Sequence, residues 1–227
     1  MNKIKDIIKE RVLVLDGPMG TMVQGYGLKE TDFRGSEFKD HHMDLVGNND
    51  ILSITRPDII SEIHKSYLQA GADLIETNTF NANSISQADY QMEHMVYDLN
   101  LQSAKIAKDI SDRFTKSNPN KPRFVCGAIG PTNQTASMSP DVSDPGHRNV
   151  DFDQLVDSYK EQVCGLVDGG VDILMIETVF DTLNCKAALF AIQSFFKELG
   201  QEIPVIVSGT ITDASGRLLS GQTVEAF

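Results

Sequence analysis

The sequence predicts an α/β fold with a parallel sheet, because short apolar runs alternate along the chain with helical patterns. The runs lack polar alternation, which is typical of strands buried on both faces. They cover residues 12–15, 74–75, 124–129, 173–176 and 205–207. Repeated βα units of this kind build either a doubly wound sheet or a (β/α)8 barrel of the TIM-barrel type.

Helical patterns occupy three of the intervals between the runs. They cover residues 59–67, 152–166 and 183–196, and each is followed by glycine, at Gly71, at Gly169-Gly170 and at Gly200. Glycine is common just past a helix end, because it readily adopts the left-handed conformation found there. Strand and helix therefore follow one another in a repeating order.

Two helix-to-strand junctions have the same pattern. Residues 70–77 read AGADLIET and residues 169–178 read GGVDILMIET, so each passes from a helix stop through Asp73 or Asp172 to a strand ending in Glu-Thr. The spacing from Asp to Glu differs by two residues, which preserves the face to which each side chain points. We interpret the two junctions as copies of one βα unit.

The barrel is the preferred form of this fold, since no Gly-x-Gly-x-x-Gly loop follows the first run to indicate a dinucleotide-binding sheet. A barrel needs eight strands, whereas the chain supplies about the first five βα units. Residues 223–227 resemble an N-cap and the first turn of a helix that has no stop signal. We therefore expect one barrel domain over residues 1–227, truncated on its C-terminal side, with two open sheet edges.

Charge and composition exclude several classes of partner. The 227 residues include 32 acidic and 20 basic side chains, for a formal net charge of −12, and no Lys or Arg cluster suits a phosphate backbone. The N-terminus starts like an amphipathic helix rather than a signal peptide, and no run of about 18 apolar residues occurs. We expect a soluble, cytoplasmic protein with neither nucleic acid nor a membrane as partner.

Chemistry is expected where the strands end, because the C-terminal ends of parallel barrel strands meet at one face. The candidate ends are residues 16–17, 76–78, 130–133, 177–178 and 208–210. They place the carboxylates of Asp16, Glu76 and Glu177 among amides, hydroxyls and glycines. Carboxylates in an apolar pocket are costly unless a cation, a metal or hydrogen-bond donors pair with them, and an ammonium ligand would suit Asp16 and Glu177.

Each of these acids also has a purely structural interpretation. Asp16 is a favoured N-cap residue, and Pro18 suits the first turn of a following helix. Glu177 could hydrogen-bond to the loop of a neighbouring strand, and Glu76 is the weakest functional candidate of the three.

No metal site within the chain is predicted. His41 and His42 are adjacent, so their side chains point apart on an extended chain, and loop packing or solvation is favoured over metal binding. Cys126, Cys164 and Cys185 form no Cys-x-x-Cys pair and fall in strand or helix patterns, where a free thiol acts as a small buried apolar group.

Eight motifs together resemble a known family over essentially the whole chain. They are LDGPMGTM (15–22), FRG (33–35), GNND (47–50), AGADLIETNTF (70–80), GAIGPTN (127–133), SPDVSDPG (139–146), LMIETVFDTLN (174–184) and SGTITDASGRLLSGQT (208–223). The chain resembles the N-terminal homocysteine-binding domain of cobalamin-dependent methionine synthases. SPDVSDPG and SGTITDASGR are more specific to these enzymes than the other motifs are.

The resemblance implies a zinc-dependent homocysteine S-methyltransferase barrel, in which the homocysteine thiolate takes a methyl group from methylcobalamin to give methionine. Zinc coordination would deprotonate the thiol, and cobalamin and methyltetrahydrofolate would bind to further domains of the same polypeptide. Asp16 and Glu177 resemble the acids that face the amino group of homocysteine, and the backbone of Gly17 suits its carboxylate. Thr77, Asn78 and Asn133 are lesser candidates for lining the mouth of the site.

The chain departs from the family pattern at two places. Where the family usually has Gly-Gly after the Asp, this chain has Gly17-Pro18, which removes one backbone N–H donor. The zinc-binding Cys and Cys-Cys of the family have no match among the three cysteines, so zinc ligands are expected downstream of residue 227 and the chain alone is expected to be inactive.

Two alternatives to the cobalamin-dependent activity follow from the same motifs. One is a related methyltransferase that takes the methyl group from betaine or S-methylmethionine, since the homocysteine barrel is shared. The other is a truncated barrel that binds an amino acid or a partner subunit without catalysis.

Overall fold

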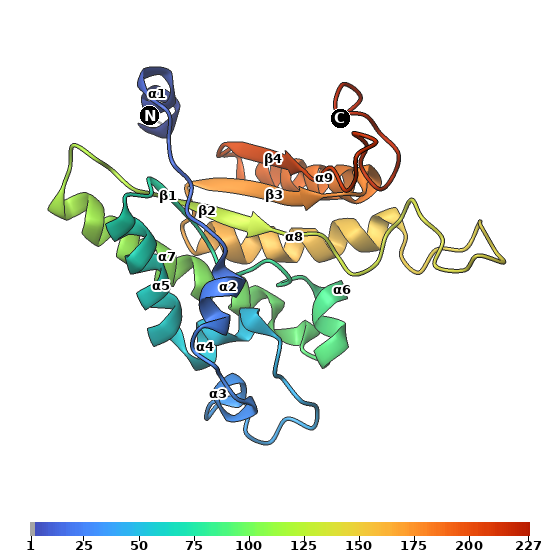
Figure 1. Ribbon diagram of the computed structural model, residues 1–227, viewed down its shortest axis with the longest axis horizontal. Helices are drawn as coiled ribbons and strands as arrows, with labels where there is room; N and C mark the ends of the chain where they lie inside the picture. The colour runs from blue at the N-terminus through green and yellow to red at the C-terminus, as the bar shows by residue number, and fades with distance from the viewer. Residues whose placement is uncertain (1–2) are drawn as a thin grey trace.

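The computed structural model describes residues 3–227 and is built on a four-stranded parallel sheet (Figure 1). The strands are β1 (Leu74–Glu76), β2 (Phe124–Ile129), β3 (Ile173–Val179) and β4 (Val205–Gly209). They lie side by side in chain order, and each neighbouring pair is parallel. The predicted α/β fold with a parallel sheet is confirmed, and the arrangement is that of an incomplete barrel.

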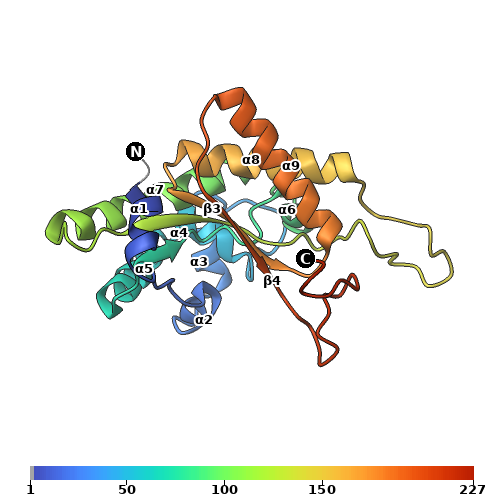
Figure 2. The same ribbon diagram turned by 90° about the horizontal axis from the view of Figure 1, so that it is seen from above.

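Four long helices cover the outer face of the sheet. They are α5 (Pro57–Ala70), α7 (Val96–Ser117), α8 (Phe152–Asp168) and α9 (Thr182–Leu199). α8 packs against both α7 and α9 (Figure 2). The buried side chains of these helices meet the outward residues of the strands, among them Val125, Ile129, Leu174 and Ile176. Removal of these apolar side chains from water holds the two layers together.

The predicted helix stops are found. Gly71 ends α5 with φ 114° and Gly200 ends α9 with φ 70°, both in the left-handed region. After α8 the left-handed residue is Gly170, with φ 90°, whereas Gly169 keeps a helical conformation. The glycines thus serve the role that their positions predicted.

The first predicted strand, residues 12–15, is not a regular strand, and this part of the prediction is wrong. The segment follows α1 (Lys3–Glu10) and runs along β1, but within the described chain its strand pairing is limited to the isolated bridge between Leu15 and Leu74. Val12 and Val14 are exposed, because no further strand among residues 3–227 covers this edge. The chain therefore supplies four strands and one irregular edge segment.

The inner face of the sheet is apolar toward the start of its strands. Leu74, Phe124, Ile173 and Met175 form a buried cluster there with Ile4 of α1. Side chains alternate along a strand, so the same face continues to Glu76 on β1 and Glu177 on β3. Those two acids therefore stand beyond the apolar cluster, toward the C-terminal ends of the strands.

The other edge of the sheet is β4, whose Ile206 and Val207 are exposed. The chain after β4 returns to the end of β3, where the Thr210 N–H donates to the Val179 carbonyl. Residues 223–227 form a turn, closed by two N–H groups on the Thr223 carbonyl, and not a regular helix. Both edges of the sheet are thus open, as the count of strands predicted.

Residues 19–95 contain short helices that no periodic pattern in the sequence indicates. They are α2 (Met19–Gln24), α3 (Glu30–Arg34), η1 (Asn49–Ile51), α4 (Leu52–Thr55), α6 (Ser84–Gln87), η2 (Ala88–Tyr90) and η3 (Glu93–Met95). Together with α5 and α7 they bury a second apolar cluster around Leu45, Ile51 and Leu52. In residues 3–227 no helix is both long and apolar enough to span a membrane.

Candidate functional site

Three carboxylates gather where the strands end. Glu76 closes β1, and Glu177 lies near the end of β3 on the same inner face. Asp16 joins them from the irregular edge, because the backbone N–H of Glu76 donates to its Oδ2 at 3.1 Å. Both glutamates act electrostatically on Asp16. The structure thus brings Asp16 and Glu177 together with Glu76, the weakest of the three candidates in the sequence.

The surroundings favour the neutral form of all three acids. Burial, reinforced by the charge of Glu76, raises the pKa of Asp16 to about 8. Burial alone raises the pKa of Glu76 to about 7. Burial and the charge of Glu76 raise the pKa of Glu177 to about 7. Such perturbed carboxyls, close together at the carboxyl edge of a parallel sheet, are typical of a binding or catalytic site.

The site lacks a positive partner within the described chain. No cation contributes to the pKa of any of the three acids, and Oδ1 of Asp16 is buried without a hydrogen-bond partner. An unpaired buried carboxylate oxygen is costly. The arrangement is therefore suited to a ligand that brings a positive charge and several N–H donors.

The structural interpretation of Asp16 as a helix cap is wrong. The N-cap residue of α2 is Pro18, and no side chain caps that helix. Asp16 instead accepts from the backbone of β1 and leaves its second oxygen free. For Glu177, none of the hydrogen bonds described within residues 3–227 uses its carboxylate, so the predicted structural bond to a neighbouring loop is not found there.

The backbone changes direction directly after Glu177. The pairing of β3 with β4 is irregular between Ile176 and Val179, and Thr178 has φ 54°. A left-handed conformation is rare for a β-branched residue and carries strain. A bulge of this kind turns side chains relative to the ladder and is common beside active sites. The strain at Thr178 therefore coincides with the position where Glu177 must face the inner side.

Gly17 is required by a close approach of α5. A Cβ added at Gly17 would lie 3.0 Å from the ring and the hydroxyl of Tyr67. The same hydroxyl donates to the Pro18 carbonyl at 3.3 Å. Tyr67 thus packs over the turn that follows Asp16, a contact that no sequence pattern indicates.

Thr77 and Asn78 are buried, and their side chains are engaged in the scaffold. Thr77 Oγ1 accepts from the Ala128 N–H at 2.9 Å. Asn78 Nδ2 donates to the Asn49 carbonyl at 2.7 Å and to Ser53 Oγ at 3.2 Å. These bonds tie the end of β1 to β2 and to α4, so any ligand contact of the two residues stays a prediction.

Asn133 lies on the exposed loop after β2, where its Nδ2 donates to Asp89 Oδ2 at 2.8 Å. None of its described contacts reaches the three acids. The loop continues through residues 139–146 and projects beyond the end of the sheet (Figures 1 and 2). Asn133 therefore belongs to the rim, and its role toward a ligand also stays a prediction.

The cysteines and histidines do not form a metal site in the described chain. No group of three or more His, Cys, Asp or Glu side chains within residues 3–227 has the geometry to hold a metal ion. Cys126 is buried on β2, Cys185 is buried on α9, and Cys164 faces Asp168 on α8. Burial raises the pKa of the Cys185 thiol to about 11, which opposes the thiolate that zinc requires. The donor set present in this chain therefore does not fit zinc.

The two adjacent histidines have other partners. His41 Nε2 lies 2.8 Å from the Tyr90 carbonyl, and His42 Nε2 lies 2.9 Å from Gln91 Oε1. These are loop-packing contacts, as the sequence predicted for this pair.

Comparisons with known proteins give both a family and a fold. A family model described as homocysteine S-methyltransferase matches residues 13–227. The metallated form of the homocysteine methyltransferase MmuM from Escherichia coli superposes with a TM-score of 0.72 at 20% identity, over 98% of this chain and 71% of that one. Its oxidized form gives a TM-score of 0.73 at 19% identity, over 99% and 70%.

The apo form of the same enzyme superposes less well, with a TM-score of 0.63 at 20% identity, over 94% of this chain and 64% of that one. At these identities the three structures establish the fold. The family rests on the match of the family model to nearly the whole sequence. The chain belongs to the homocysteine S-methyltransferase family.

Proposed function

We propose that the three acids hold the ammonium group of homocysteine, and that the chain is the homocysteine-binding part of a methyltransferase that forms methionine. The observation that carries this proposal is the gathering of Asp16, Glu76 and Glu177 with no cation of the described chain beside them. Three carboxylates without a counter-charge suit a ligand with a single positive group and three N–H donors.

Each part of the site has a task in this proposal. Asp16 offers its free Oδ1 to the ammonium, and Glu177 offers a carboxylate with no described partner. The backbone beside Gly17 faces the ligand carboxylate, while Pro18 supplies no N–H there. With its charged end held by the acids, the ligand would extend its thiol away from them, along the inner face.

The reaction proposed is transfer of a methyl group to sulfur. The bond between the donor and the methyl group breaks as the sulfur–methyl bond of methionine forms, and the thiol gives up its proton. We propose methylcobalamin, carried on another domain of a longer polypeptide, as the donor. The support is the SPDVSDPG run, which lies on the projecting loop beyond β2, at the same end of the sheet as the acids.

The other donors that the sequence left open, betaine and S-methylmethionine, use the same acceptor. Structural similarity to the E. coli homocysteine methyltransferase fits such an enzyme as well. The donors are distinguished by supplying each of them with homocysteine and measuring methionine.

Zinc, which the family resemblance implies, does not fit the donor set of residues 3–227. Its predicted ligands downstream of residue 227 stay a prediction, as do the cobalamin and folate domains. The prediction has a direct consequence: this chain, supplied with zinc, homocysteine and any of the three donors, forms no methionine. Methionine formation by the 227-residue chain would contradict it.

Binding can be tested without turnover. Calorimetric titration of the chain with homocysteine is compared with titration with 4-mercaptobutanoic acid, which keeps the thiol and carboxylate but lacks the ammonium. We expect loss of the ammonium to weaken binding by about tenfold or more, the usual value of a charged hydrogen bond. Equal affinities for the two compounds would contradict the proposal.

A further inference from the structure

The repeated junctions AGAD and GGVD have a shared structural role. Asp73 precedes β1 and Asp172 precedes β3, and each carboxylate accepts from a backbone N–H of the preceding segment of the sheet. For Asp73 the donor is Val14, at 3.0 Å, and for Asp172 it is Val125, at 2.9 Å. Each aspartate thus joins its own strand to the neighbour that comes earlier in the chain.

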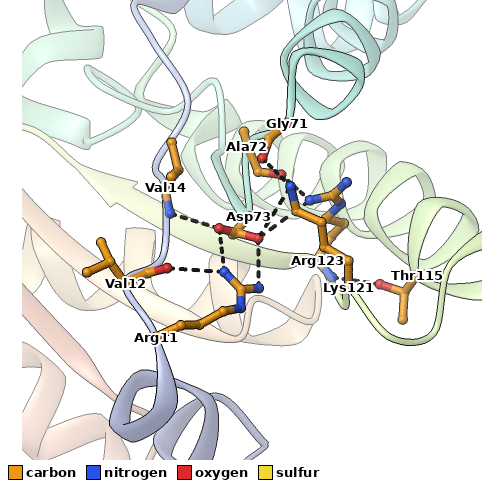
Figure 3. Close-up of polar contacts among 9 residues, drawn as sticks. All are labelled: Arg11, Val12, Val14, Gly71, Ala72, Asp73, Thr115, Lys121 and Arg123. Atoms are coloured by element: carbon orange, nitrogen blue, oxygen red, sulfur yellow. Dashed lines mark hydrogen bonds and ion pairs between the residues drawn. The ribbon is translucent and has the colours of Figure 1, made fainter.

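Asp73 is the centre of a larger set of contacts (Figure 3). Arg11 binds it through both terminal nitrogens, each at 2.9 Å, and Arg123 Nη1 lies 3.5 Å away. Its side chain is only 2% exposed. The hydrogen bond and charge of Arg11, with the Val14 N–H, hold the pKa of Asp73 below its usual value despite burial. The carboxylate is therefore charged and firmly held at neutral pH.

A short chain of hydrogen bonds leads from Asp73 to the acid site. The Asp73 N–H donates to the Val14 carbonyl at 2.7 Å, and the Asp16 N–H donates to the Leu74 carbonyl at 3.0 Å. The Glu76 N–H then donates to Asp16 Oδ2 at 3.1 Å. Asp73 contacts the edge segment before β1 begins, and Asp16 contacts β1 at its end. The same register between the edge segment and β1 therefore gives both contacts.

The two aspartates differ in how much their contacts matter. β2 and β3 are held in register by four paired residues, from Cys126 with Ile173 to Ile129 with Ile176. Residues 12–15 have a single bridge to β1, Leu15 with Leu74. A slip of one residue turns every side chain of a segment to the opposite face, and short ladders resist slipping poorly. The edge segment therefore depends on Asp73 far more than β2 depends on Asp172.

We infer that Asp73 is a positioning residue for Asp16: by fixing residues 11–16 against β1, it holds the Asp16 carboxylate beside Glu76, where the ammonium of the ligand would lie. The part of the inference that concerns the ligand rests on the proposed function. The part that concerns the register of residues 11–16 does not, because the register can be measured in the absence of any ligand.

The test compares Asp73→Asn with the matched control Asp172→Asn. Backbone amide exchange followed by NMR reports register directly, at the N–H groups of Asp16 and Glu76. Asp73→Asn is expected to speed their exchange by about tenfold or more, while amides between β2 and β3 stay protected. Homocysteine affinity, measured by calorimetry, is expected to fall by about tenfold in Asp73→Asn and by less than about twofold in Asp172→Asn.

Unchanged exchange at Asp16 and Glu76 in Asp73→Asn, or an equal loss of affinity in both variants, would overturn the inference. If Asp73→Asn does not fold, Arg11→Gln serves instead, because it keeps the Val14 bond. It is expected to move the same two amides in the same direction by about threefold, and no change there would overturn the inference. A wild-type chain that binds no homocysteine would refute the proposed function, while the exchange data would still decide the role of Asp73.

Discussion

At the level of single residues, the site is a group of acids whose surroundings favour their neutral forms. Asp16, Glu76 and Glu177 each have a pKa within about one unit of neutrality, because burial opposes the charge of all three and the charge of Glu76 adds to this at Asp16 and Glu177. The sequence indicated all three from their place at strand ends, with Glu76 as the weakest candidate. The Glu-Thr pair that ends both copies of the repeat is the sequence signal that favours Glu76.

The acids lower the stability of the empty protein. A carboxyl whose folded pKa is raised gives full stability below its unfolded pKa and loses it as the pH rises through the folded value. For Glu177 the loss therefore runs from about pH 4.5 to about pH 7. Glu177→Gln is expected to have a higher Tm than wild type at pH 8, because the variant lacks the buried charge. The increase is about 2–4 °C for each kcal/mol of unfolding free energy that this charge costs the wild type, and little difference in Tm is expected at pH 4.

Melting curves of Glu177→Gln, wild type and the exposed control Glu202→Gln at both pH values check this prediction. The same variant is expected to bind homocysteine about tenfold more weakly. A Tm difference that does not depend on pH would show that the Glu177 carboxyl is not perturbed.

Thr178 stores strain beside the site. Its φ of 54° is in the left-handed region, which costs a β-branched residue on the order of 1 kcal/mol. Thr178→Gly removes that cost, partly offset by the greater entropy of the unfolded glycine chain. Denaturant unfolding is expected to give an increase in the free energy of unfolding of up to about 1 kcal/mol, and a clear decrease would mean that the threonine side chain is itself stabilising.

At the scale of elements, the regular parts of the fold were predictable and the irregular parts were not. β2 covers the same residues as the apolar run that predicted it, and α5 and α9 end directly before the predicted glycines. Residues 12–15 do not form a regular strand. An apolar run predicts a buried strand, but at this edge no further strand of the described chain lies beside the segment to bury it. α7 was missed because small and polar residues, such as Ser103 and Ala104, occupy much of its buried face.

The small residues of α7 matter because α8 approaches it closely. A Cβ added at Gly165 would lie 2.6 Å from the Tyr97 carbonyl oxygen, and one at Gly169 would lie 2.4 Å from Ala104 Cβ. Gly165→Ala is therefore expected to lower the free energy of unfolding by about 1–3 kcal/mol, because the helices must move apart. The control is Gly20→Ala in α2, where an added Cβ would lie 3.8 Å from Asn49 Nδ2, and this variant is expected to be neutral or slightly stabilising.

Chemical denaturation of the two glycine variants, compared with wild type, decides this point. Equal stability of Gly165→Ala and Gly20→Ala would mean that the contact between α7 and α8 is looser than the structure describes.

At the scale of the whole molecule, the fold brings together acids that are 161 residues apart in the sequence numbering, from Asp16 to Glu177. Strand order could be expected from the repeated βα unit, and with it the face on which the strand ends meet. The burial that raises the pKa values of these acids could not be expected from the sequence, because it depends on the apolar cluster of the inner face and on the turn held by Tyr67. The net charge of −12 adds a general attraction for cations.

The central claim is that the ammonium of homocysteine is bound by the three perturbed carboxyls. An approaching positive charge lowers their pKa values, so binding near pH 7 must drive protons off the protein. The direct measurement is calorimetry of homocysteine binding at pH 7 in two buffers of different ionisation enthalpy, which yields the number of protons exchanged. We expect net proton release that is smaller in Glu177→Gln than in wild type. Binding without proton exchange, or with proton uptake, would show that the ammonium is not held by these carboxyls.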